Sequence, residues 1–226
     1  MKAIILAAGR GERLRPLTDE TPKPLIYAGK KRLIEYHLEN LARVGITEIV
    51  INVSYKVEDF LPILGTGEKY GVDITYSVEQ PKALETGGGI LNALPLLGDK
   101  PFIAISADVW ADYPLEKLVQ KAANLGSNLA HLVLVPNPSF RPQGDFGLEQ
   151  DLITAGNAAK FTYANLGVYA PALFKDCHEK AFKLAPLLYQ AIAEQKISGE
   201  LYSDAWFNIG THEQLNALRK HLWKLP

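Results

Sequence analysis

Short apolar runs alternate with amphipathic segments along the first half of the chain. Several runs are continuous rather than alternating, which is typical of strands buried on both faces of a sheet. Between them, apolar residues recur at helical spacing, as Ile34, Leu38 and Leu41 do. Strands that alternate with helices in this way predict βαβ units and a parallel sheet. The predicted strands are 3–8, 48–53, 71–76 and 102–106, and the predicted helices are 33–44, 57–64, 89–97 and 115–125.

The pattern changes in the second half, where Pro136, Pro138 and Pro142 interrupt the chain. We expect the mixed part of the sheet and a lid-like lobe here. The last helix should be N-capped by Thr211, with Gln214 at the capping-box position. The fold class is therefore α/β, a three-layer Rossmann-like sandwich with a mixed, mostly parallel central sheet. The predicted elements are strands 130–135, 146–153 and 160–169, a turn at 155–157, a short strand and turn at 206–211, and helices 186–194 and 211–222.

Composition narrows the class of protein. The chain has 226 residues, of which 47% are hydrophobic, so we expect one domain, 1–226, with a sizeable core. A formal net charge of −1 gives no electrostatic reason to expect nucleic acid or a membrane as partner. The single cysteine, Cys177, fits a reducing compartment. The first apolar run stops at Ala8, which is too short for a signal peptide, so we expect a cytoplasmic protein.

A glycine-rich turn follows the first predicted strand. Gly9 and Gly11 let backbone N–H groups approach an anion closely, and Arg13 and Lys23 bring cations to the same end of the chain. A phosphate site at the carboxyl end of a parallel strand has this composition. The third glycine of the dinucleotide fingerprint is absent, which excludes a Rossmann dehydrogenase, and there is no Gly-Lys-Ser/Thr. Spacing alone leaves a phosphate site and a structural turn equally open.

The residue string itself is more specific. Leu6-Ala7-Ala8-Gly9-x-Gly11-x-Arg13-Leu14, followed by Pro22-Lys23-Pro24-Leu25, resembles the signature of the sugar-1-phosphate nucleotidylyltransferases. From end to end, the chain is most similar to the N-acetylmuramate-1-phosphate uridylyltransferases among them. The resemblance implies a nucleotide-diphospho-sugar transferase fold, with a nucleotide-binding half at about 1–112 and a sugar-binding part and lid at about 113–226. It implies catalytic roles for Arg13 and Lys23, and nucleotide contacts for Leu6, Ala7, Ala8, Gly9 and Gly11.

A second glycine cluster, Gly87 to Gly89, precedes the helix predicted from residue 89. It is either a plain flexible turn or a place where the backbone approaches a base or a sugar hydroxyl. The resemblance implies that Thr86 and Gly87 lie against the base and ribose, and that Gln80 reads uracil. Glu85 stands where relatives commonly have glycine.

Asp108 follows the predicted strand 102–106 and faces the same crevice as the glycine turn. By itself it is either a solvated carboxylate or a ligand for a hard cation. The stretch Ala107-Asp108-Val109-Trp110 resembles the family's metal-binding motif, which implies Mg²⁺ on Asp108, with Asn208 as the second ligand. Because an amide contributes no charge, we expect Mg²⁺ to arrive largely with the nucleotide.

The acceptor side carries a weaker match. Gly147 and Asn165 correspond to sugar-binding positions of the family, but the usual glutamate–lysine pair before that asparagine is not matched. The resemblance implies uridylyl transfer from UTP to a sugar-1-phosphate such as N-acetylmuramate-1-phosphate, in recycling of cell-wall sugars. The alternatives are a mannose-1-phosphate guanylyltransferase and a non-catalytic nucleotide-sugar sensor. The expected partners are small-molecule substrates, for a monomer or small homo-oligomer.

Overall fold

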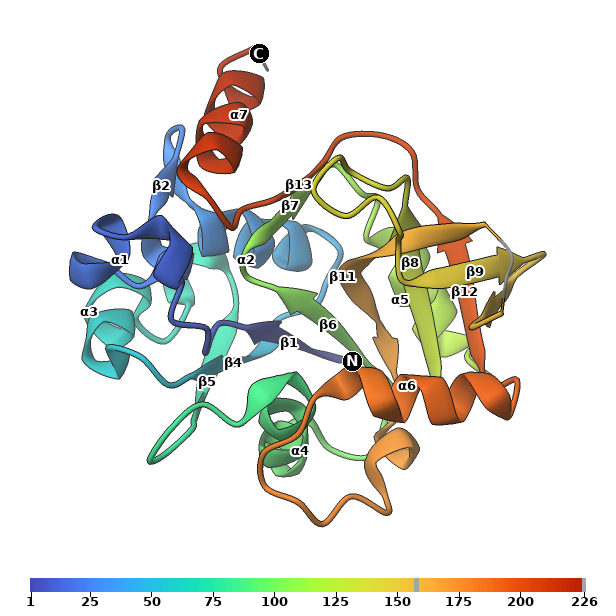
Figure 1. Cartoon of the computed structure of the whole chain (residues 1–226). Coiled ribbons are helices and arrows are strands. Elements are labelled where there is room, and N and C mark those ends of the chain that lie inside the picture. Colours follow the sequence, from blue (N-terminus) through green and yellow to red (C-terminus); the bar gives the residue numbers. More distant parts are fainter. Residues whose placement is uncertain (157–158, 225–226) are drawn as a thin grey trace.

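The computed structural model describes residues 1–156 and 159–224 (Figure 1). The helices are α1 (Leu17–Glu20), α2 (Leu33–Arg43), α3 (Phe60–Leu64), α4 (Glu85–Leu97), α5 (Glu116–Ala123), α6 (Leu184–Ala193) and α7 (His212–Leu222). The strands are β1 (Lys2–Leu6), β2 (Tyr27–Ala28), β3 (Lys31–Arg32), β4 (Glu48–Val53), β5 (Asp73–Val78), β6 (Phe102–Ser106), β7 (Val109–Ala111), β8 (Ala130–Val135), β9 (Phe146–Glu149), β10 (Leu152–Thr154), β11 (Lys160–Tyr169), β12 (Ile197–Leu201) and β13 (Trp206–Asn208). The 3-10 turns are η1 (Glu12–Leu14), η2 (Lys23–Leu25), η3 (Val57–Asp59), η4 (Glu68–Tyr70) and η5 (Pro171–Phe174).

The parallel half of the sheet confirms the βαβ pattern read from the sequence. Its strand order is β5-β4-β1-β6, and all three pairings are parallel. The chain adds β4 and β5 on one side of β1 and then returns through α4 to place β6 on the other side. In open α/β sheets, ligands bind outside the carboxyl ends of the strands where the order reverses in this way. That point lies between β1 and β6, where Leu6 is the register partner of Ser106.

The second half of the sheet is mixed, and antiparallel pairs predominate there rather than parallel ones. Within the described residues the full sheet has nine strands, and its order continues β6-β11-β8-β12-β10-β9. Only β8 and β12 run parallel in this half. The predicted strand 146–153 is wrong in one respect: Gln150, with φ of 56°, lies in a turn that divides it into β9 and β10. The predicted turn at 155–157 lies partly outside the described residues.

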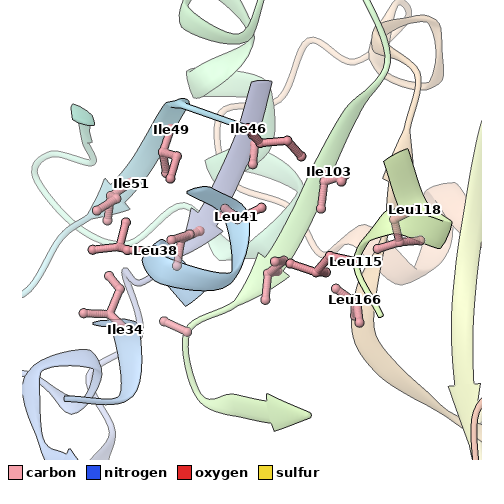
Figure 2. Close-up of a cluster of buried hydrophobic side chains, with 14 of the residues drawn as sticks. Ile34, Leu38, Leu41, Ile46, Ile49, Ile51, Ile103, Leu115, Leu118 and Leu166 are labelled. Carbon is pink, nitrogen blue, oxygen red and sulfur yellow. The ribbon is translucent and has the colours of Figure 1, made fainter. Parts of the chain in front are cut away.

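Helices pack on both faces of this sheet. On one face, apolar side chains of α2 and α5 meet those of β4, β6 and β11. Figure 2 shows this buried cluster, with Leu38, Ile51 and Leu118 among the labelled residues. On the other face, α4 and α6 cover β1, β6 and β8, with Ile90 and Leu188 among the buried contacts. Burial of each large aliphatic side chain contributes about 1.5–3 kcal/mol relative to exposure. The continuous apolar runs of the central strands are therefore explained by burial on both sides.

A short antiparallel ribbon, β7 with β13, stands apart from the large sheet (Figure 1). A third buried cluster packs against this ribbon. It joins Trp110 of β7 and Ile209 after β13 to Leu14 and to Leu215 of α7. Thr211 caps α7 as predicted, because its Oγ1 accepts a hydrogen bond from the Gln214 N–H at 3.3 Å. The short strand and turn predicted at 206–211 are confirmed in the strand, which spans Trp206–Asn208.

No helix among residues 1–156 and 159–224 is both long and apolar enough to cross a membrane.

Candidate active site

A cavity of about 290 Å³ opens at the carboxyl ends of β1, β4 and β6, where the strand order reverses. Its walls come from the glycine loop after β1, from η2, from the start of α4 and from the turn after β6. The lining residues are Leu6, Ala7, Ala8, Gly9, Lys23, Pro24, Asn52, Glu79, Ala83, Glu85, Thr86, Ser106, Ala107 and Asp108.

A second hollow of about 380 Å³ adjoins the first and is rich in cations. Its lining residues are Arg10, Gly11, Glu12, Arg13, Lys23 and Gly210. Lys23 lines both spaces, so the two hollows lie side by side, and the second is the one in which cations predominate. The charged phosphates of a nucleotide would be attracted to a hollow in which cations predominate.

The two glycines of the first loop have different environments. At Gly11, φ is +66°, and an added Cβ would lie 2.9 Å from Thr18 Cγ2 and 3.1 Å from Lys23 Cβ. Glycine is required there because a side chain would displace the stem of Lys23. At Gly9, no atom lies within 4 Å of an added Cβ, so the packing of the protein does not demand glycine. Gly9 therefore leaves open space in the wall of the cavity, as close backbone approach to a ligand requires.

Lys23 and Asp108 form the polar centre of the site. Lys23 Nζ donates to Asp108 Oδ2 at 2.6 Å, and the two side chains are 11% and 31% exposed. Lys23 is held by η2, where Leu25 is buried and prolines flank the lysine. Asp108 lies in the turn between β6 and β7. Because the Asp108 side chain is partly exposed, the pair is accessible to a further cation or anion from the cavity.

The ribbon brings Asn208 next to Asp108. Asn208 of β13 is the register partner of Val109 of β7, and the Ile209 N–H donates to the Asp108 carbonyl at 2.7 Å. The two positions that the sequence assigned to a metal are therefore neighbours across the ribbon. Among residues 1–156 and 159–224, no three His, Cys, Asp or Glu side chains gather into a metal site, so a cation here would take further ligands from elsewhere.

Arg13 lies at the cationic end. Leu14 next to it is fully buried and anchors η1, while the Arg13 guanidinium packs against Gly210. An added Cβ at Gly210 would lie only 2.5 Å from Arg13 Nη2. Gly210 follows β13, so the ribbon that carries Asn208 also fixes where the Arg13 guanidinium lies.

Comparison with known proteins agrees with this geometry. The model of the nucleotidyl transferase family matches residues 2–224. The chain belongs to the nucleotidyl transferase family. It is 44% identical over 93% of its length to the N-acetylmuramate alpha-1-phosphate uridylyltransferase of Neisseria meningitidis, 94% of which is covered. It is 31% identical over 92% of its length to the enzyme of that name from Caulobacter vibrioides, 91% of which is covered.

Solved structures show the same fold at low identity. A Bacillus anthracis protein proposed to be a glucose-1-phosphate thymidylyltransferase superposes with a TM-score of 0.89 and 21% identity. That comparison covers 100% of this chain and 96% of the other. The nucleotide-diphospho-sugar transferase fold and the nucleotidyltransferase class expected from the sequence are thus confirmed.

The second glycine cluster of this nucleotidyltransferase does not precede a helix, as the sequence suggested, but lies inside the first turn of α4. An added Cβ at Gly87 would lie 2.4 Å from the Phe182 ring, and one at Gly88 would lie 2.2 Å from the Lys180 carbonyl. The N–H groups of Gly87 and Gly88 both donate to the Phe182 carbonyl, at 3.0 and 3.1 Å. Because these glycines have no side chains, the segment before α6 can pack against the start of α4. The helix α4 begins earlier than predicted because the Phe182 carbonyl of that segment accepts from its first N–H groups.

The predicted base-binding residues are only partly brought together. Thr86 is exposed and lines the cavity, next to Glu85, whose φ of 61° lies in the left-handed region that favours glycine. Gly87 is buried beneath Phe182 and does not line the cavity, and Gln80 is exposed outside its lining. The contacts assigned to Gln80 and Gly87 stay predictions.

The predicted sugar-binding residues lie on the neighbouring strands. Gly147 is in β9, and Asn165 is in β11 at an irregularity of its pairing with β8, with φ of 57°. The indole Nε1 of Trp206 donates to the Ala164 carbonyl at 3.1 Å, which ties this irregularity to β13. Neither Gly147 nor Asn165 lines the 290 Å³ cavity. Their roles also stay predictions.

Sequence reasoning missed two polar residues of the cavity wall, Asn52 and Glu79. Both are almost fully buried, at 3% and 2% exposure. Burial raises the pKa of Glu79, while hydrogen bonds from the Leu84 N–H and the Asn52 amide act in the opposite direction. The signal was present, since Asn52 interrupts an otherwise apolar predicted strand.

Proposed function

We propose that the protein transfers the uridylyl group of UTP to a sugar-1-phosphate, N-acetylmuramate α-1-phosphate, and releases pyrophosphate. The observation that carries the proposal is the Lys23–Asp108 pair where the cavity after β1 and β6 meets the cation-rich hollow. The names of the Neisseria and Caulobacter relatives support the choice of base and sugar. The product would serve the recycling of cell-wall sugars.

The reaction needs no nucleophilic side chain. A sugar phosphate is largely ionised at pH 7, since its second pKa lies near about 6. Its oxygen attacks the α-phosphorus of UTP in line, the new P–O bond forms, and the bond to the bridging oxygen of pyrophosphate breaks with the electron pair. Catalysis then consists of positioning the two substrates and stabilising the developing charge.

Two cations of the chain have separate tasks. Lys23 stands where the hollows meet, so its ammonium neutralises charge on the α-phosphate and on the incoming sugar phosphate. Arg13, placed against Gly210 at the cationic end, holds the β- and γ-phosphates that leave as pyrophosphate. The chain from Leu6 to Gly9 forms one wall around the rest of the nucleotide, with Thr86 on the opposite wall.

The residues fit a bound Mg²⁺. Asp108 offers a carboxylate that is 31% exposed, and Asn208 stands beside it across the ribbon, so both ligand types are hard oxygen donors. Mg²⁺ usually reaches a protein through one or two carboxylates plus substrate phosphates. When bound here, it would supply further positive charge to the phosphate oxygens. We infer that Lys23 then exchanges Asp108 for the substrate phosphate as its anionic partner.

The acceptor sugar belongs to the second half of the chain. We propose that residues of about 1–112 bind the nucleotide, and that residues of about 113–226 bind the sugar through Gly147 and Asn165 and form a lid. Buried clusters on both sides of the sheet support the three-layer sandwich.

The test is pyrophosphate release in the presence of Mg²⁺, with UTP, GTP, CTP and dTTP each crossed with N-acetylmuramate-, N-acetylglucosamine-, glucose- and mannose-1-phosphate. We expect turnover with UTP and N-acetylmuramate-1-phosphate. Lys23→Ala should lower kcat by about 10²–10³-fold, as does removal of other groups that stabilise developing charge. Lys117→Ala, on the exposed face of α5, is the matched control and should leave kcat unchanged.

Each other outcome would change a different part of the proposal. Turnover with GTP and mannose-1-phosphate would keep the mechanism and overturn the choice of base and sugar. Full activity of Lys23→Ala would refute the role of the lysine. No turnover in the whole grid, together with tight nucleotide binding, would instead favour a nucleotide-sugar sensor.

A further inference from the structure

A chain of short hydrogen bonds runs behind the nucleotide cavity and joins its two walls. The Ala7 N–H donates to Asn52 Oδ1 at 2.7 Å, and Asn52 Nδ2 donates to Glu79 Oε1 at 2.6 Å. The Leu84 N–H donates to Glu79 Oε2 at 2.7 Å. Ala7 begins the glycine loop, and Leu84 immediately precedes α4. The loop and the helix therefore meet through two side chains rather than through backbone pairing.

The direction of every hydrogen bond in this chain is determined. An amide N–H can only donate, so the Ala7 N–H fixes the oxygen of Asn52 on its side and turns the Asn52 NH₂ toward Glu79. The Leu84 N–H occupies the other carboxylate oxygen. Both oxygens of Glu79 are acceptors, which describes an ionised carboxylate.

The helix α4 also packs directly against Asn52 and Glu79. An added Cβ at Gly89 of α4 would lie 2.4 Å from Glu79 Oε1 and 2.7 Å from Asn52 Nδ2. The third glycine of the cluster thus lets α4 close directly over the two polar groups. Buried hydrogen-bonded groups confined in this way have one arrangement, because any other leaves a donor or an acceptor without a partner.

We propose that Asn52 and Glu79 are positioning residues that set the separation of the glycine loop from the start of α4 and so determine which base the cavity accepts. The inference rests on the proposed function, since it takes this cavity as the nucleotide site. Both residues line the cavity, and the segments they join are its opposite walls. Binding geometry has to be held to within about 0.5 Å, which rigid supporting groups achieve.

Three variants separate hydrogen bonding from mere bulk. Glu79→Gln has the same shape, but its NH₂ group must face either Asn52 Nδ2 or the Leu84 N–H, so one hydrogen bond becomes a donor–donor contact. Asn52→Asp sets two carboxylates against each other. In the double variant Asn52→Asp/Glu79→Gln, the new carboxylate at position 52 accepts from the Ala7 N–H and from the new amide NH₂ at position 79. The amide oxygen at position 79 then accepts from the Leu84 N–H. The exchange restores every hydrogen bond at the same positions and with the same net charge.

The readouts are KM and kcat for UTP, KM for the sugar phosphate, and the ratio of kcat/KM for UTP to that for dTTP and for GTP. Each single variant should raise KM for UTP by about tenfold, because one charge-assisted hydrogen bond is lost. It should also bring the ratios of kcat/KM for UTP to those for dTTP and GTP closer to one. The values of kcat and of KM for the sugar phosphate should change little. The double variant should recover the wild-type KM and base ratios.

Ser77→Ala is the matched control. It removes a part-buried hydrogen bond that also involves α4, from Asn92 Nδ2 to Ser77 Oγ of β5 at 3.0 Å, outside the cavity lining. It should lower the thermal unfolding temperature without changing KM or the base ratios. Wild-type KM and base ratios in Glu79→Gln would overturn the inference, as would a double variant as impaired as the single ones. Absence of turnover in the wild type would instead refute the proposed function.

Discussion

Replacement of Gly88 by alanine tests whether the second glycine cluster serves packing. In a helix, alanine is more favourable than glycine by about 1 kcal/mol, so propensity alone predicts that Gly88→Ala stabilises α4. The structure predicts the opposite. The new Cβ would lie 2.2 Å from the Lys180 carbonyl oxygen and 3.1 Å from Ala181 Cα. Carbon–oxygen contacts of this kind need about 3.3 Å, so the segment before α6 would have to move by about 1 Å.

That movement has a calculable cost. Forcing a methyl group into a packed site costs about 1–3 kcal/mol. The two hydrogen bonds from Gly87 and Gly88 to the Phe182 carbonyl would be lost or lengthened, at about 1 kcal/mol each. After subtraction of the helix preference, the free energy of unfolding should fall by about 3 kcal/mol, a large part of the 5–15 kcal/mol typical of a folded protein. Urea unfolding followed by tryptophan fluorescence would measure it.

Gly9→Ala is the contrasting variant. No atom lies within 4 Å of the new Cβ and φ is not positive, so the free energy of unfolding should change by less than about 0.5 kcal/mol. Because Gly9 lines the cavity, KM for UTP should nevertheless rise. A Gly88→Ala protein as stable as the wild type would show that the segment before α6 does not depend on the missing Cβ, and the reasoning would fail.

Two further predictions follow from the site and the core. Gly210→Ala should push the Arg13 guanidinium aside, since its Cβ would lie 2.5 Å from Nη2; kcat should fall while the urea midpoint stays constant, and unchanged kcat would exclude Arg13 from catalysis. Burial lowers the pKa of His131 to about 4, from 6.5 in the unfolded chain. The unfolded state then binds more protons than the folded state between these values, so stability falls as pH drops from 6.5 toward 4, by about 2 kcal/mol between pH 6.5 and 5. His131→Asn keeps a partner for Ser198 without the titration, and urea unfolding at both pH values should show a loss smaller by that amount; an equal loss would contradict the assignment.

The parts of the fold that depend on residues adjacent in the sequence could be predicted from it. The central strands follow from unbroken apolar runs, and the Gly11 turn and the Lys23 segment are contiguous stretches with their own chemistry. Asp108 could be placed because the end of a parallel strand locates it. Each of these inferences needs only a short window of sequence.

Features made by distant residues could not be predicted. The packing role of Gly88 depends on Lys180. The hydrogen bonds of Asn52 are made with Ala7 and Glu79, which follow two other strands. In the sequence, glycines that make room for protein look the same as glycines that make room for a ligand. Antiparallel pairing of β11 with β6 was likewise invisible, because a run buried on both faces has the same composition in either direction.

The β7–β13 ribbon has a consequence for how the protein is made. A ribosome releases β13, Gly210 and α7 only after every strand of the nine-stranded sheet in the described residues has been synthesised. A nascent chain can therefore complete its main sheet while Asp108 still lacks its neighbour Asn208 and Arg13 still lacks its support at Gly210. Translation products that stop before residue 206 would contain every strand of this sheet yet lack Asn208 beside Asp108 and Gly210 against Arg13. Catalytic competence would thus be acquired last, as a late step of biosynthesis rather than with the core.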